Sequence, residues 1–558
     1  MKRKYTPYIY ILFLWGSLLQ VSAQEVSLEV FTERPENKVF VSQLHYQHRL
    51  DHEHMIPQQI DSIYKQLNAL GFLHPTIRHN KINDSTINAH IHLGNQLTHA
   101  LLKIPPNVFT DKELKELPGK LTQNQLSIAF TQTQNALQQI AHLLDQRGET
   151  FSTVRLTKIS INGSLLRATL AITQTAPRRI DKISIQGYPE LSKGYIKQYL
   201  GLEIGQTFKK SDLLPLYEQL NTIPFIRQLK APQVLFTKDT THLYLFLQKQ
   251  MVNQFDGLIG FTSKETGGGL QFNGHIDLAL QNVFNGGEAI QLSWKNNGNE
   301  QQQLKLDIKT PYFLQTKFTP AFHFNVFKQD STYVNSTTEM TLGYALKFNH
   351  AIGLSAEWEK STSNTNQLPT PNYTHFYLGA FYQHSIPSFT KLYPQKAQLA
   401  IHLHTGKRTI TSSEQQTRIR LSGSYIWQVS QQHHVYLANV TQWLSSDTYL
   451  QNELFRIGGA NSIRGFNEDQ FFSNAYSYVN LEYRFAPNND TYFYSITDFG
   501  SAENKNALVS TKFYSFGLGY VIQTKMGLVN LSYAVGGITK QALTLNDSRL
   551  HIKFVTNF

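Results

Sequence analysis

The sequence predicts a multidomain chain in which N-terminal α+β repeats are followed by a C-terminal 16-stranded antiparallel transmembrane β-barrel. Up to about residue 250, amphipathic helices and strand pairs return at a regular interval, whereas short alternating runs continue from about residue 252 to the C-terminus. Charged residues make up only 16% of the 558 residues and aromatic residues 12%. No stretch after the extreme N-terminus holds 18 consecutive apolar residues. Barrel strands give this composition because their lipid-facing and lumen-facing residues alternate.

Residues 1–23 are predicted to form a secretory signal peptide. Lys2, Arg3 and Lys4 precede an apolar run over 8–19, and the small residues of 21–23 offer a cleavage site. The alternative is a membrane anchor, which the shortness of the apolar run disfavours. Cleavage would lower the formal net charge from +12 to +9. In a secreted chain such a basic balance fits lipid phosphates or acidic partners better than nucleic acid, which is not expected as a partner.

The residue types exclude several kinds of chemistry. The chain has no cysteine, so disulfides, thiolate metal sites, cysteine nucleophiles and a lipid-modified N-terminal cysteine are ruled out. The polar run over 51–54 (DHEH) lacks the spacing of a zinc-binding helix and is interpreted as a solvated loop. No GxSxG elbow is present. We therefore predict no metal, no cofactor and no catalytic residue.

A weak repeat organises the first 250 residues. Three amphipathic stretches each stop at a helix breaker, and Gly71, Gly148 and Pro224 are spaced 77 and 76 residues apart. Two alternating runs joined by a polar turn follow each stretch, as expected for a hairpin. The helical stretches are 60–72, 136–148 and 213–225, and the hairpins are 76–81 with 86–93, 153–162 with 165–173, and 233–237 with 241–247. The repeat predicts units at residues 24–96, 97–176 and 177–250, with the barrel at 251–558.

About sixteen alternating runs follow. Sixteen strands over this length leave about nineteen residues for each strand and its loop, the size typical of outer-membrane barrels. If the first strand rises from the N-terminal units, the turns at 282–287 and 310–312 face those units. The loop after the eleventh strand then leaves from the opposite, extracellular side. The runs are 271–280, 289–294, 302–308, 318–327, 375–382, 398–404, 418–427, 435–443, 476–485, 491–497, 513–522, 528–535 and 550–558, with weaker runs near Gly257, Thr338 and Leu354.

The candidate site is the stretch 455–466, FRIGGANSIRGF, which follows the eleventh run. Glycines allow backbone angles closed to other residues and let a loop lie against a wall. A guanidinium held in such a loop needs a carboxylate. We expect Asp498 as its first partner, because Gly500 beside it permits close approach, and Glu482 as its second. The residues of the predicted loop motif are Gly458, Gly459, Ile463, Arg464, Gly465 and Phe466. An ordinary glycine-rich turn with a solvated arginine is the alternative.

The loop motif resembles that of the outer-membrane assembly superfamily, which contains BamA, TamA and the two-partner secretion transporters. In that superfamily an Arg-Gly-Phe/Tyr loop inside the barrel meets an aspartate on a neighbouring strand; Ile496 here replaces the usual aromatic residue of the strand motif. The β-α-α-β-β order of residues 177–250 resembles the POTRA domain, a periplasmic module that binds extended peptide at its sheet edge. Three units resemble TamA more than BamA. Two-partner secretion transporters have two units and a plug helix, for which the sequence offers no strong candidate.

The resemblance implies an aromatic C-terminal signal by which barrel proteins are themselves recognised, with Phe554 and Phe558 in that role and Thr556 interrupting the apolar face. It also implies a seam between the first and last strands. Gly257 and Gly260 lie in the predicted first strand, and because glycine weakens strand pairing this seam is a plausible gate; a simple bulge is the alternative.

The expected function is non-enzymatic assembly, insertion or translocation of polypeptides at the outer membrane. The units would capture a client by strand addition in the periplasm and the barrel would deliver it to the membrane. Expected partners are outer-membrane lipids, unfolded barrel or secreted polypeptides, and an accessory TamB-like protein or lipoprotein. A two-partner-secretion exporter and a passive porin are the alternatives. A porin does not need the N-terminal repeats.

Overall fold

The computed structural model describes residues 26–83, 85–263, 270–296, 301–330, 332–347, 349–363, 370–388, 392–393, 395–524, 527–539, 543–544 and 548–557. The predicted signal peptide and Phe558 lie outside these residues. The chain forms two compact units, one up to Arg178 together with Thr207–Ser211, and the other made of Arg179–Gln206 with the rest of the chain. Among the described residues, no helix combines the length and apolar character needed to cross a membrane.

The first sheet has the order β2-β1-β4-β3, with β1 (Val26–Thr32), β2 (Arg49–Leu50), β3 (Thr76–Asn83) and β4 (Thr86–His92). A short helix, α1 (Lys38–Val41), precedes β2, and α2 (Ile56–Ala69) packs on the sheet. Helix α2 forms because Ile63 and Leu67 are one turn apart on one face, and both are fully buried against Leu28. It ends before Gly71, whose backbone is left-handed (φ 104°).

The second sheet has the order β6-β7-β5-β9-β8. Helix α4 buries Ala136 and Ile140 against it, and Arg147 at its C-terminal end holds Glu113 of α3. Arg147 Nε donates to Glu113 Oε1 at 2.9 Å, and this bonding lowers the pKa of Glu113 to about 2. The elements are β5 (His99–Lys103), α3 (Asp111–Lys115), β6 (Lys120–Thr122), β7 (Gln125–Ala129), α4 (Thr133–Gln146), β8 (Thr153–Asn162) and β9 (Leu165–Thr173).

The third sheet belongs to the second compact unit and has the order β10-β12-β11. Strand β10 (Lys182–Gln186) pairs in parallel with β12 (Thr241–Lys249), and β11 (Ile226–Phe236) pairs antiparallel with β12. Helices α5 (Lys193–Leu200) and α6 (Leu213–Leu220) lie between β10 and β11 in the chain. The β-α-α-β-β order expected from the sequence is present. Ser192 caps α5 by accepting from the Tyr195 N–H at 3.2 Å, and Gly201 closes it in the left-handed region.

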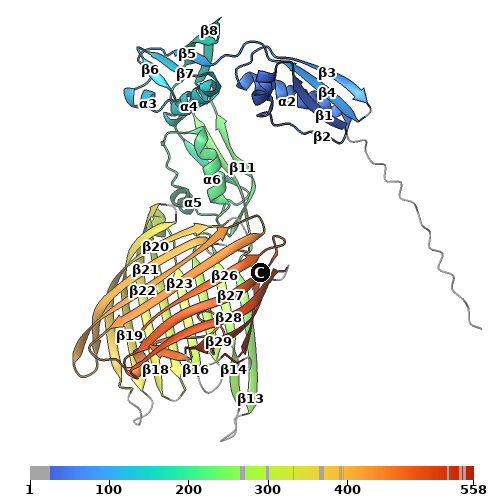
Figure 1. The fold of residues 1–558 in the computed structure, drawn as a ribbon. Helices are drawn as coiled ribbons and strands as arrows, with labels where there is room; N and C mark the ends of the chain where they lie inside the picture. The colour runs from blue at the N-terminus through green and yellow to red at the C-terminus, as the bar shows by residue number, and fades with distance from the viewer. Residues whose placement is uncertain are drawn as a thin grey trace, which may run out of the picture. The chain divides into compact units, whose positions relative to one another are not determined.

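Sixteen antiparallel strands close into a barrel, which confirms the predicted fold class (Figure 1). Two short strands, β24 (Phe455–Ile457) and β25 (Phe471–Ser473), pair only with each other. The barrel strands are β13 (Gln254–Ser263), β14 (Leu270–Gln281), β15 (Ala289–Asn296), β16 (Gln301–Lys309), β17 (Phe318–Gln329), β18 (Tyr333–Lys347), β19 (His350–Ser363), β20 (Tyr373–Pro387), β21 (Gln395–Thr409), β22 (Ser413–Gln428), β23 (His433–Ser445), β26 (Ala475–Phe485), β27 (Thr491–Asn504), β28 (Val509–Gln523), β29 (Gly527–Ile538) and β30 (Ser548–Asn557).

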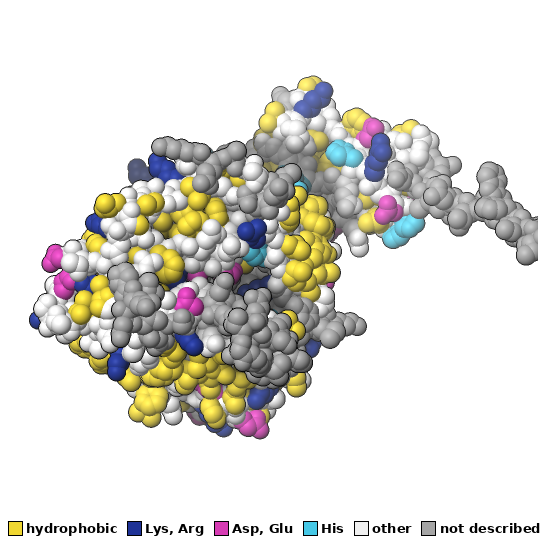
Figure 2. Space-filling view, turned by 90° about the horizontal axis from the view of Figure 1, so that it is seen from below, with side chains coloured by type: hydrophobic (Ala, Val, Ile, Leu, Met, Phe, Trp, Pro, Cys, Tyr) yellow, Lys and Arg dark blue, Asp and Glu magenta, His cyan; other side chains and the backbone are white. Residues whose placement is uncertain are grey.

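Alternation along the strands separates an apolar outer face from a polar lumen. On β20 the side chains alternate: Phe376 and Leu378 are exposed outward, whereas His375 and Tyr377 are buried inside. Figure 2 shows hydrophobic side chains gathered along the outer wall of the barrel. Such a wall suits a lipid bilayer, since lipid cannot solvate charge.

The seam of the barrel has few paired residues. Among the described residues, β13 pairs with β30 through Gln254↔Asn557 and Phe255↔Thr556, whereas β13 and β14 share ten register pairs. Closure of the barrel therefore depends on a short stretch at one end of both strands.

The third unit contacts the turn between β14 and β15. Tyr188 Oη donates to Asn285 Oδ1 at 2.5 Å and accepts from Asn282 Nδ2 at 2.9 Å. The Ser192 N–H donates to the Asn285 carbonyl at 2.9 Å. Gly287 in this turn leaves no room for a side chain, because a Cβ there would lie 2.1 Å from Tyr195.

Helix α5 also contacts the turn between β16 and β17. The rings of Tyr195 and Tyr312 stack edge to face with centroids 5.5 Å apart, and Gln198 Nε2 donates to the Gln315 carbonyl at 2.7 Å. Both turns lie at the same end of the barrel, as the parity of the strands predicts. The loop after β23 therefore starts at the other end.

Candidate functional site

The loop between β23 and β26, residues 446–474, folds back on itself through β24 and β25. These strands pair Phe455 with Ser473 and Ile457 with Phe471. Between them the chain turns at Gly458 and Gly459, both with left-handed backbones (φ 124° and 102°). A Cβ at Gly458 would lie 2.5 Å from the Asn467 carbonyl oxygen, so glycine alone permits this turn.

Arg464 lies in the turn and contacts both predicted carboxylates. Its backbone N–H and its Nε donate to Asp498 Oδ2 at 3.0 and 2.9 Å, and Nη2 donates to Oδ1 at 2.6 Å. Nη1 donates to Glu482 Oε1 at 2.5 Å. Asp498 is fully buried, and Arg464 is only 7% exposed. The fork of the guanidinium is thus matched by two acceptors on adjacent strands, β27 and β26.

Glu482 is shared between two arginines. Its other oxygen, Oε2, accepts from Arg484 Nε at 2.8 Å, and the Arg484 guanidinium lies 4.1 Å from the ring centre of Tyr436. The two carboxylates therefore meet two guanidinium groups, so the local charge is balanced. A buried arginine is stable only with such compensation.

Two glycines let the loop approach the barrel wall. A Cβ at Gly465 would lie 2.4 Å from the Gly536 nitrogen on β29, and one at Gly500 would lie 2.8 Å from Ile463 Cδ1. Ile463 and Phe466 are buried in an apolar cluster with Phe513. The loop thus lies against β27, β28 and β29 through the residue types that the motif analysis picked out.

A second set of contacts, which the sequence did not predict, joins the same loop to strands β21 and β22. Glu453 Oε1 accepts from Arg408 Nη1 on β21 at 2.5 Å, and Oε2 accepts from Gln416 Nε2 on β22 at 3.1 Å. All three side chains are at most 5% exposed. Arg408 also contacts Glu414 and donates to Thr448 Oγ1 at 2.6 Å. We call Glu453 and its partners the second anchor.

Asn452 extends the second anchor to β18–β20. Its Nδ2 donates to Ser361 Oγ at 2.7 Å and to the Pro371 carbonyl at 3.1 Å. Its carbonyl accepts from Asn335 Nδ2 at 2.6 Å and from the Tyr373 hydroxyl at 3.2 Å. One 3-10 turn, Gln451–Glu453, therefore reaches five barrel strands.

Below this turn the lumen wall carries a buried ion-pair network centred on Glu357. Its oxygens accept from Arg418 Nη1 at 2.8 Å and Arg420 Nη2 at 2.9 Å, and His375 Nε2 lies 3.0 Å away. These groups come from β19, β20 and β22. Two cavities, of about 1040 and 730 Å³, lie beside the loop. Both cavities are lined by charged and polar side chains as well as apolar ones.

The side chains of the two aromatic residues of the predicted C-terminal recognition signal are not described by the structure. Phe558 lies outside the described residues, as does the side chain of Phe554. On the same strand Leu550 and Ile552 are 64% and 67% exposed. The recognition role of Phe554 and Phe558 remains a prediction.

A family model describing the haemolysin secretion/activation protein ShlB/FhaC/HecB matches residues 345–522. No curated protein sequence matches the chain. The fold is similar to CdiB from Escherichia coli (14% identity over 95% of this chain and 100% of that one, TM-score 0.52) and to CdiB from Acinetobacter baumannii (16%, 90% and 98%, TM-score 0.51). BamA from Haemophilus ducreyi lacking POTRA domains 1–3 gives 14%, 80% and 97%, with a TM-score of 0.48.

The matched segment covers β19 to β27 with parts of β18 and β28, and it includes the loop with Arg464 and both carboxylates. The closer resemblance to TamA than to BamA stays a prediction. The match over residues 345–522 and the closed 16-stranded barrel with its N-terminal α+β units confirm the predicted resemblance to the outer-membrane assembly and translocation superfamily, and they indicate an outer-membrane protein whose N-terminal units lie in the periplasm.

Proposed function

We propose that this protein exports a polypeptide across the outer membrane as the transporter of a two-partner secretion system. The observation that carries the proposal is the match of residues 345–522 to a family described as haemolysin secretion and activation proteins. The similar fold of the two CdiB proteins supports the architecture that such a transporter needs. Export by two-partner secretion is one of the alternatives to barrel assembly that the sequence offers.

Client capture is proposed to use the open edges of the periplasmic sheets. In the third sheet β11 lies at the edge, because the order is β10-β12-β11. Its side chains Leu229 and Leu235 are 56% and 50% exposed. An extended polypeptide could pair with the free backbone groups of this edge and cover these apolar side chains.

Passage is proposed to require movement of the anchored loop. The larger lumenal cavity is lined by residues of β13–β15 and, from the loop, by Ala460, Asn461, Ser462, Arg464 and Glu468. The loop therefore stands in the path of a chain through the barrel. The two anchors hold the loop from different strands, and releasing the Arg464 contact would leave the second anchor in place. The loop could then swing without leaving the lumen.

Assembly of other barrel proteins is the second candidate. Three α+β units precede the barrel, one more than the family resemblance implies for a two-partner transporter. The seam of two register pairs would also suit lateral opening. A passive porin explains neither the periplasmic units nor the anchored loop.

Depletion of the protein from its own cell separates the two candidates. We expect one or a few polypeptides to disappear from the culture medium and to build up in the periplasm, while the other outer-membrane barrels keep their levels. Quantitative proteomics of medium, periplasm and outer membrane measures both. General loss of outer-membrane barrels with an unchanged medium would refute export and support assembly.

A further inference from the structure

Among the described residues, three groups of histidine and carboxylate side chains bring possible metal-binding atoms within 4.8 Å of one another. All three lie on barrel strands. Two of them contain Glu357, whose charge is already balanced by Arg418 and Arg420. Bound arginines leave no reason for a cation in those two groups. The third group, Asp256, His275 and Asp277, forms no ion pair with an arginine among the described residues.

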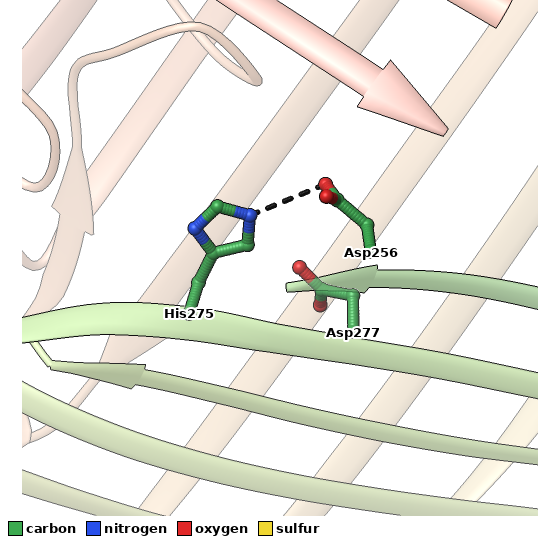
Figure 3. A group of neighbouring side chains, drawn as sticks. All are labelled: Asp256, His275 and Asp277. Atoms are coloured by element: carbon green, nitrogen blue, oxygen red, sulfur yellow. Dashed lines mark hydrogen bonds and ion pairs between the residues drawn. The ribbon is translucent and has the colours of Figure 1, made fainter. Parts of the chain in front are cut away.

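The third group bridges the first two barrel strands. Asp256 on β13 is directly opposite Asp277 on β14, and His275 is two residues before Asp277 on the same face. Figure 3 shows the three side chains converging above the strands, with His275 bonded to Asp256. All three line the larger lumenal cavity, so water and ions can reach them.

The charges of this group are not balanced within the described residues. Two carboxylates in directly opposed positions repel each other. Neither accepts an ion pair from lysine or arginine there, although Lys295 of β15 is the register partner of His275. With a neutral imidazole the three groups carry two negative charges, which a divalent cation would neutralise.

The spacing suits a small tetrahedral ion. His275 Nε2 and Asp256 Oδ2 are 3.2 Å apart. Zinc–nitrogen and zinc–oxygen bonds of about 2.1 Å at a tetrahedral angle place two ligand atoms about 3.4 Å apart. The third ligand atom is within 4.8 Å, a distance that rotation of the partly buried Asp277 side chain can close. Water from the cavity would supply the fourth ligand.

We propose that Asp256, His275 and Asp277 form a binding site for a divalent transition-metal ion, with Zn²⁺ as the best-fitting occupant. One imidazole and two carboxylates are a donor set that zinc accepts and that disfavours the harder Mg²⁺ and Ca²⁺. The ion would join β13 to β14 just inside the seam, where β13 has few bonds to β30. It would thereby hold the first strand in register independently of the client that the barrel carries.

The test compares zinc binding by the full-length protein and by the D256N/D277N variant, both purified in detergent and equilibrated with buffered free Zn²⁺. We expect the variant to bind one equivalent less, as measured by elemental analysis after removal of free ion. Resistance of the unheated barrel to SDS checks that each protein is folded. If the double variant does not fold, D277N alone serves, because Asp277 has no bonded partner among the described residues that the change would remove.

The matched control is D307N. Asp307 also bonds a lumenal histidine, with Oδ1 2.5 Å from His323 Nδ1, but no second carboxylate among the described residues completes that pair. We expect D307N to keep the wild-type stoichiometry. Co²⁺ provides a second readout, since tetrahedral binding should give an intense visible absorption in the wild type and D307N but not in D256N/D277N. Equal zinc content in all three proteins, or the same loss in D307N, would overturn the site.

Discussion

Arg464 is the residue on which the position of the loop depends. Its guanidinium is buried between Asp498 and Glu482, so we expect R464A to release the turn while the barrel still closes. A charge-assisted hydrogen bond contributes about 1.5–3 kcal/mol, and the loop should gain mobility accordingly. External protease should then cut within 458–468 of folded, membrane-inserted protein. The cut fragments and the change in client export are the two measurements.

The D498A variant provides the comparison. If the two residues act as one contact, R464A/D498A should be little worse than either single variant. Strictly additive losses, or a loop equally protected in all variants, would show that this pair does not hold the loop. Glu482 would then be the partner to test, because Arg484 also contacts it.

Glu453 makes an independent prediction for the second anchor. E453A should free the segment around the 3-10 turn while the Arg464 contact persists, since the two sets of partners are on different strands. Arg408 keeps its contact with Glu414 in this variant, so the expected loss of stabilising free energy is about 1–3 kcal/mol. D447A is the control, because Asp447 is an exposed residue of the same loop. Hydrogen exchange of residues 448–454 should rise in E453A and not in D447A; equal exchange would count against the anchor.

The contrast between the two anchors shows what a sequence can reveal about a site. Arg464 stands among glycines and before an Asp-x-Gly, so its environment and its acceptor could both be proposed. Glu453 and Arg408 are 45 residues apart without any local pattern, and a lone glutamate in a polar loop resembles any solvated residue. Only the register that places β21 beside β22 brings Gln416 and Arg408 to the same point of the lumen.

At the scale of the element, helix α5 and the preceding residue Tyr188 join the third unit to the barrel. Y188F removes the hydroxyl that joins Asn282 and Asn285, and we expect faster amide exchange in the turn 282–288 with little change inside the strands. Y217F, on the exposed side of α6, is the matched control. Unchanged exchange in Y188F would show that the packing around Tyr195 and Tyr312 suffices.

The contact between α3 and α4 predicts a pH dependence in the second sheet. Hydrogen bonding to Arg147 lowers the pKa of Glu113 to about 2, below its usual value of 4.5. A depressed carboxyl pKa adds stability above the usual value, and this stability is lost as the pH falls toward 2. E113Q should therefore be less stable than the wild type at neutral pH, and the difference should shrink between about pH 4.5 and 2. Urea unfolding of this region at several pH values measures it; a pH-independent difference would contradict the assignment.

The elements themselves were largely predictable. All sixteen runs predicted for the barrel are strands in the structure. The sequence underestimated strand length: the run expected at 418–427 is the middle of β22, Ser413–Gln428. Its first residues are polar on both faces, so alternation ends before the hydrogen bonds do. The five-stranded second sheet was also not anticipated, since β6 is only three residues long.

At the scale of the molecule, residues 24–250 are predicted to fold as a soluble fragment. The three sheets have their own apolar cores and no lipid-facing band. Circular dichroism of the purified fragment should show a folded α+β protein. An insoluble or unfolded fragment would mean that the third unit needs the barrel turns that contact α5.

We propose that the client passes through the lumen of the barrel and not through the seam between β13 and β30. The chain has no native cysteine, so a disulfide can be placed across the seam at the register pairs Gln254↔Asn557 or Phe255↔Thr556 without competing thiols. The measurement is export of the client identified by depletion, in cells whose protein carries this disulfide, before and after reductant. We predict wild-type export from the locked barrel. Export that stops when the seam is locked and returns on reduction would contradict the account and show that the seam opens.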